Sequence, residues 1–215
     1  MNSRSLLRNA VIFGAPLSYL VIGAIHPMNL YVGDDPSLYL GIHVVQLFSI
    51  WGMALMLRFL TEGVENGPAR FARAAILPYA IVYSAFDALA GIAIGLLVRE
   101  ANGMAPAGQQ AIQSFLAHPN PHPVEVILYL ASGLTWLVAA GAAILSLKGR
   151  APAGPLALLL VGSAIFAVAH PFPPGPMGMA IFIAGLAWLS LAPRSSLPRT
   201  VVAASALPEP RGLSS

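Results

Sequence analysis

Residues 73–98 read RAAILPYAIVYSAFDALAGIAIGLLV, a stretch of 26 residues in which Asp87 is the one charged side chain after the initial arginine. A helix needs about 20 apolar residues to cross the hydrocarbon core of a bilayer, so the stretch predicts a membrane-spanning helix. Polar and small residues recur at every fourth position and therefore lie close to one helix face. They are Tyr79, Tyr83, Asp87, Gly91 and Gly95. An ionisable side chain is costly in a span, so this face is a candidate for function.

The composition of the whole chain is also that of a membrane protein. Of 215 residues, 57% are hydrophobic and 9% are charged, whereas soluble domains carry about a quarter charged residues. The formal net charge is +3, but the basic residues lie in short segments beside apolar runs. That placement favours membrane orientation over nucleic-acid binding, and no nucleic-acid partner is expected. Cysteine is absent, so a metal site would use nitrogen, oxygen or thioether ligands.

Six apolar runs predict an all-α integral membrane protein, a six-helix bundle built from three helical hairpins. Helices are favoured over a barrel because the runs are continuous rather than alternating. We expect one transmembrane domain over residues 1–193 and a disordered cytoplasmic tail over 194–215, which is rich in Ser, Pro and Ala. The predicted spans are 9–26, 37–58, 73–98, 124–147, 154–170 and 176–193.

The basic residues predict how these spans are oriented. Ten of the 11 lie on one side of the spans, and Arg99 lies on the other together with all five histidines. Basic loops face the cytoplasm, so both termini are predicted to be cytoplasmic in a multi-pass protein of the bacterial-type plasma (inner) membrane. The ten are Arg4, Arg8, Arg58, Arg70, Arg73, Lys148, Arg150, Arg194, Arg199 and Arg211.

The predicted outer connections contain repeated His-Pro pairs. These pairs are His26-Pro27, His118-Pro119, His122-Pro123 and His170-Pro171. Proline ends helices and histidine tolerates an interface, so the pairs are explained either by structure alone or by a functional site. The longest connection runs over 99–122, and residues 109–117 within it have the spacing of a short interfacial helix. Such a helix serves either as an anchor or as a lid.

Positions along the helices predict that His43 and Asp87 lie at the same depth. His43 is 15 positions from Arg58, and Asp87 is 14 positions from Arg73. At about 1.5 Å per residue these separations are roughly 22 and 21 Å. A buried aspartate must be protonated or paired, and an imidazole at equal depth is the best partner in this sequence. We therefore predict an Asp87–His43 pair, which serves either helix packing or function.

The ionisable residues of the outer side have the ligand chemistry of a transition-metal site. Imidazole and carboxylate suit zinc, copper, iron or manganese, and a carboxylate behind a ligating histidine is common. The candidate metal ligands are His26, His43, Asp87 and His170. His26 and His170, predicted at similar height, are also the candidate axial ligands of a haem b. Asp87 and Glu125 are the candidate general bases for a metal-activated water.

The sequence is compatible with three functions. The favoured one is a metal- or haem-binding membrane redox component or metalloenzyme that acts on a lipid-soluble substrate. The second is a small transporter or proton-coupled carrier in which Asp87 and His43 form a relay. The third is a non-catalytic subunit or assembly factor that binds other membrane subunits, with polar stripes that only hold helices together.

Overall fold

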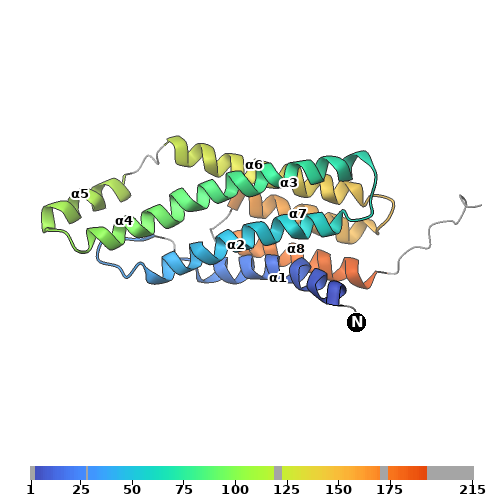
Figure 1. Ribbon diagram of the computed structural model, residues 1–215, viewed down its shortest axis with the longest axis horizontal. Helices are drawn as coiled ribbons and strands as arrows, with labels where there is room; N and C mark the ends of the chain where they lie inside the picture. Colours follow the sequence, from blue (N-terminus) through green and yellow to red (C-terminus); the bar gives the residue numbers. More distant parts are fainter. Residues whose placement is uncertain (1–2, 28, 119–122, 170–173, 193–215) are drawn as a thin grey trace, which may run out of the picture.

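The computed structural model describes residues 3–27, 29–118, 123–169 and 174–192, and these ranges contain helices but no strand. The long helices run side by side along one axis (Figure 1). Their bounds are α1 Ser3–Ile25, α2 Ser37–Leu60, α3 Gly67–Asp87, the π-helix η1 Ala88–Ala93, α4 Ile94–Ala101, α5 Pro106–Leu116, α6 Pro123–Ser146, α7 Ala153–Ala169 and α8 Pro174–Leu191.

Five of the helical segments are long and apolar enough to cross a membrane. They are Leu6–Ile25, Ser37–Leu60, Gly67–Ala101, Pro123–Ser146 and Pro174–Leu191. The helix Ala153–Ala169 is apolar but shorter. The prediction of a helical multi-pass membrane protein is thus confirmed at the level of five long apolar helices and a shorter one. Six crossings, the hairpin topology and the cytoplasmic termini stay predictions.

The continuous segment Gly67–Ala101 is longer than a span requires. Its 35 residues correspond to roughly 52 Å of helix, whereas the hydrocarbon core is about 30 Å thick. At its far end α5 lies beside α4 (Figure 1). A short helix, α5, covers most of the predicted range 109–117, and it begins earlier because Pro106 occupies its first turn. Its location at a membrane interface stays a prediction.

Small residues allow a close contact between α7 and α8. A Cβ atom at Gly162 would lie 2.6 Å from the carbonyl oxygen of Gly178 and 2.6 Å from the backbone nitrogen of Phe182. The two backbones therefore touch, as small residues permit in membrane helices. A side chain larger than hydrogen at Gly162 would force α7 and α8 apart.

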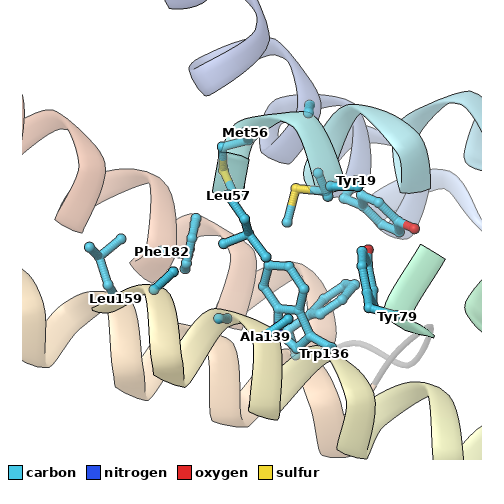
Figure 2. Close-up of a cluster of buried hydrophobic side chains, with 14 of the residues drawn as sticks. Tyr19, Met56, Leu57, Tyr79, Trp136, Ala139, Leu159 and Phe182 are labelled. Atoms are coloured by element: carbon cyan, nitrogen blue, oxygen red, sulfur yellow. The ribbon is translucent and has the colours of Figure 1, made fainter. Parts of the chain in front are cut away.

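Large apolar side chains fill the centre of the bundle. Figure 2 shows Met56, Leu57, Trp136, Leu159 and Phe182 pointing into a common interior from α2, α6, α7 and α8. The indole Nε1 of the fully buried Trp136 donates a 3.2 Å hydrogen bond to the carbonyl oxygen of Ser163. The one polar atom of this ring is therefore satisfied inside the apolar core.

Polar contacts tie together the end of the bundle that carries the basic loops, which we call the basic end. Arg73 donates to the carbonyl oxygens of Thr61 (3.0 Å) and Val64 (2.9 Å), and so closes the α2–α3 connection. Asn66 caps α3 by accepting from the backbone nitrogen of Ala69 at 2.9 Å, and its amide donates to the carbonyl oxygen of Ser146 at 2.8 Å. The opposite end, where α1 ends and α2 begins, is called the histidine end.

Replacement of Asn66 by alanine is expected to lower the free energy of unfolding in detergent micelles by about 1–2 kcal/mol. The change removes an N-cap and leaves the Ser146 carbonyl oxygen without its donor. The control is Asn9→Ala on the exposed face of α1, which is expected to stay within about 0.5 kcal/mol of wild type. Equal stability of the two variants would contradict this role of Asn66.

The basic end is predicted to face the cytoplasm, and reporter fusions test this. Alkaline phosphatase needs disulfides and is active outside the cytoplasm. A fusion at Met104, between α4 and α5, is expected to be active, whereas fusions at Gly149 and after Ser215 are expected to be inactive. The opposite pattern would reverse the orientation, and an active C-terminal fusion alone would mean that one of the last two helices does not cross.

Candidate functional site

A cluster of ionisable side chains lies at the histidine end. His26 follows the last residue of α1, His43 lies on α2, and Asp87 is the last residue of α3. His43 is 6% exposed and Asp87 is 1% exposed. Among the His, Asp, Glu, Lys and Arg side chains that the structure describes, these two are the buried ones. The structure thus gathers its costliest polar groups at one place.

His43 and Asp87 form a direct hydrogen-bonded pair. The Nδ1 atom of His43 lies 2.8 Å from Oδ1 of Asp87. The predicted pairing of these residues at equal depth on neighbouring helices is confirmed. The second carboxylate oxygen, Oδ2, is buried and has no hydrogen-bond partner in the described part of the chain.

The second nitrogen of His43 faces another imidazole. Its Nε2 atom lies 3.2 Å from Nε2 of His26, and the two rings meet edge to face with an interplanar angle of 89°. The Nδ1 atom of His26 lies 2.7 Å from the carbonyl oxygen of Pro27. The four groups therefore form a continuous series of contacts that runs from the carboxylate of Asp87 through two imidazoles to the carbonyl oxygen of Pro27.

The hydrogen-bond donors and acceptors of these four groups do not balance if both imidazoles are neutral and Asp87 is ionised. A carbonyl oxygen and a carboxylate only accept, so each Nδ1 must carry a hydrogen and donate it. This assignment follows from the hydrogen-bond partners. Both Nε2 atoms then present lone pairs to each other across 3.2 Å. The cluster therefore needs one further cation, either an additional proton or a metal ion.

Hydrogen bonds hold the loop that follows His26. The amide of Asn102 accepts from the backbone nitrogen of Gly33 at 2.7 Å and donates to the carbonyl oxygen of Asp34 at 2.8 Å. Gln113 of α5 accepts from the backbone nitrogen of Val32 at 2.8 Å. Gly33 has a φ of 102°, a conformation that L side chains rarely adopt. The α4–α5 segment thus fixes the loop next to the cluster, and no sequence motif marks Asn102 or Gln113 for this role.

Three tyrosines lie between the cluster and the apolar core. Tyr83 is one helical turn before Asp87, and its ring centroid is 6.1 Å from that of Tyr19 and 5.7 Å from that of Tyr79. The polar face predicted on the third span therefore meets Tyr19 of α1. Toward the basic end, these tyrosines are followed by large apolar side chains (Figure 2).

A small cavity adjoins this tyrosine layer. Among its lining residues are aromatic side chains from three helices, and it has room for about one water molecule. The residues that line it are Tyr83, Phe86, Tyr129, Ser132, Gly133, Phe166 and Ala167. Ser132 donates to the carbonyl oxygen of Tyr129 at 2.7 Å, so its hydroxyl hydrogen is already used there.

The predicted site residues are only partly brought together. His26, His43 and Asp87 are contiguous, but within the described ranges no three His, Asp or Glu side chains group so as to hold a metal ion. Asp87 touches the nitrogen of His43 that faces away from His26. Glu125 lies in the first turn of α6, partly exposed, and no hydrogen bond in the described part of the chain joins it to the cluster. His170 lies outside the described residues.

A double-mutant cycle measures the energy of the buried pair. We expect His43→Ala and Asp87→Ala to be non-additive by about 1 kcal/mol in the free energy of unfolding, the scale of polar pairs between membrane helices. Asp87→Ala combined with Ser190→Ala, an exposed position on α8, is the control and is expected to be additive. Additivity of the first cycle would mean that the pair contributes no coupling.

No protein family, curated protein or solved structure matches the chain. The function must therefore be argued from the site itself.

Proposed function

We propose that this chain is a metal-binding membrane protein in which His26 and His43 hold a transition-metal ion through their Nε2 atoms. One observation carries the proposal. The two Nε2 atoms lie 3.2 Å apart, while the other nitrogen of each ring faces a group that accepts a hydrogen. A metal ion between the rings would satisfy both lone pairs at once.

The separation of the nitrogens supports a shared ion. Two imidazole nitrogens at about 2.0–2.1 Å from a tetrahedral zinc ion lie about 3.3 Å apart. The Nε2–Nε2 distance of 3.2 Å is close to this value. A haem cannot enter between nitrogens this close, so the proposal at the His26–His43 pair is for a single ion. The haem b predicted between His26 and His170 stays a prediction, because His170 lies outside the described residues.

The groups behind the histidines also support a metal ion. Ligating histidines usually donate their second ring hydrogen to a carboxylate or a backbone carbonyl, which fixes the ring and raises its basicity. His43 has the carboxylate of Asp87 in this place, and His26 has the carbonyl oxygen of Pro27. Asp87 is therefore proposed to orient His43, a different role from the general base predicted by sequence.

Two ligands leave part of the coordination sphere open. Imidazole ligation without cysteine favours zinc, copper, iron or manganese, and zinc suits the tetrahedral separation. Positions that the protein leaves open are taken by water or substrate in catalytic sites, where the metal activates the water. We propose this use of the ion, on a lipid-soluble substrate, because the site lies among apolar helices. His170 remains the candidate for a further ligand.

The proton-coupled carrier is the less favoured alternative. An additional proton would also satisfy the facing lone pairs, and transport would then require a polar path through the bundle. Toward the basic end, the fully buried Met53 and Leu57 follow Tyr19, Tyr79 and Tyr83. The buried hydroxyls of Thr61 and Ser146 lie near the helix ends there and donate to the backbone carbonyl oxygens of Leu57 and Ala143. Such a relay would open to the histidine end alone, which is unfavourable for transport.

Metal loading of the purified, chelator-treated protein tests the proposal. Wild type is expected to bind one Zn²⁺ or Co²⁺ per chain, measured by elemental analysis and by the visible Co²⁺ spectrum. His26→Ala and His43→Ala are expected to abolish this binding, and Asp87→Asn to weaken it about 10- to 100-fold, as loss of an outer partner does.

His118→Ala is the matched control, because His118 is exposed at the same end of the chain's fold. It is expected to leave both stoichiometry and affinity unchanged. Absence of bound metal in wild type, or binding that survives removal of both His26 and His43, would refute the metal proposal. In the first case the extra cation of the cluster would be a proton.

A further inference from the structure

The helix changes its winding directly after Asp87. Ala88–Ala93 is a π-helix inside the otherwise α-helical segment Gly67–Ala101. Such turns are rare and occur frequently at functional sites. In an α-helix each step of four residues drifts by about 40° around the axis, because a turn contains 3.6 residues. The wider π turn offsets this drift, and Asp87, Gly91 and Gly95 all stay buried.

Gly91 in this turn lies against the imidazole of His43. A Cβ atom built at Gly91 would overlap the His43 ring, with Nδ1, Cγ and Cε1 as the nearest atoms. The ring therefore occupies the space that any other residue at position 91 would need. The sequence pattern places Gly91 only among the small residues of a polar helix face, whereas in the structure Gly91 leaves room for the ring of His43, a candidate metal ligand.

Tyr39 holds the same turn from the other helix. Its hydroxyl donates a 2.9 Å hydrogen bond to the carbonyl oxygen of Ala90 in η1. Its ring centroid lies 4.5 Å from that of His43 and 5.5 Å from that of His26. Tyr39 thus joins α2 to the π turn and packs against both imidazoles at once.

We infer that Gly91 and Tyr39 are positioning residues for the histidine pair. Gly91 determines where the His43 ring lies, and the Tyr39–Ala90 hydrogen bond keeps η1 at that distance from α2. Together they set the separation of the two Nε2 atoms, on which binding of one ion by both rings depends. The inference rests on the proposed metal site and adds Gly91, which has no side chain, and Tyr39, whose hydroxyl is engaged by the carbonyl oxygen of Ala90.

The alternative is that Gly91 only permits helix packing, and two control glycines separate these roles. Gly41 lies on α2, two residues from His43, and a Cβ atom there meets nothing within 4 Å. Gly52 lies at a crowded α1–α2 contact, where a Cβ atom would be 3.0 Å from the Cβ of Ala15. Gly52→Ala therefore disturbs packing away from the cluster, and Gly41→Ala disturbs nothing nearby.

The experiment compares Gly91→Ala and Tyr39→Phe with these controls. Gly91→Ala is expected to weaken Co²⁺ binding about 10- to 100-fold, the range found for residues that orient ligands, and to alter the visible Co²⁺ spectrum. Tyr39→Phe keeps the ring, removes only the hydrogen bond, and is expected to weaken binding severalfold. Gly41→Ala and Gly52→Ala are expected to bind as wild type does. Tyr39→Phe keeps the test decisive if Gly91→Ala fails to fold.

A readout without metal separates this inference from the proposed function. In the metal-free protein, ¹⁵N NMR of histidine detects the His43 Nδ1–H that faces Asp87, and Gly91→Ala is expected to shift or remove this signal. An unchanged signal, or wild-type Co²⁺ binding by both variants, would overturn the positioning role and leave the metal site intact. Equal losses in Gly91→Ala and Gly52→Ala would also overturn it. If wild type binds no metal but the NMR signal changes as expected, the metal proposal fails and the positioning of His43 stands.

Discussion

The hydrogen bond between His43 and Asp87 is the constraint on which the histidine end depends. A carboxylate at 1% exposure inside an apolar bundle is costly unless a partner offsets the lost hydration. His43 supplies that partner at 2.8 Å, and the contact fixes the relative depth of α2 and α3. It also commits Nδ1 of His43, so that Nε2 is the nitrogen left for His26. One contact thus stabilises the bundle and determines which atoms face each other.

The bundle is divided into two regions of different physical character. Toward the basic end, Trp136, Leu159 and Phe182 pack in an apolar core, in which the indole nitrogen of Trp136 donates to the carbonyl oxygen of Ser163. Toward the histidine end, imidazole, carboxylate and phenol groups replace aliphatic side chains. Dense apolar packing resists both water and ions, whereas the second region offers lone pairs close to one surface of the molecule. A reactive or ion-binding site is therefore expected at the histidine end, where the packing is least apolar.

Helix bounds were predicted less well than helix existence, and α3 shows why. Hydropathy places the third span at 73–98, because only that part is continuously apolar. The helix begins at Gly67, since Asn66 caps it and Pro68 stands in its first turn. Asn66 and Pro68 are both visible in the sequence, but neither is apolar, so a hydropathy criterion does not include them in the span. The π turn over Ala88–Ala93, which contacts α2, has no such signal in the sequence.

The sequence by itself determined the apolar helices, the polar stripe on the third span and the equal depth of His43 and Asp87. These follow from residue spacing along regular helices, which has a fixed rise and period. Only the tertiary structure decided that Nε2 of His26 meets Nε2 of His43, that Gly91 makes room for the imidazole, and that Tyr39 binds the carbonyl of Ala90. Such contacts depend on how far each helix is rotated about its axis and on the path of the loop after α1. That rotation is set by packing between helices, which residue spacing within one helix does not encode.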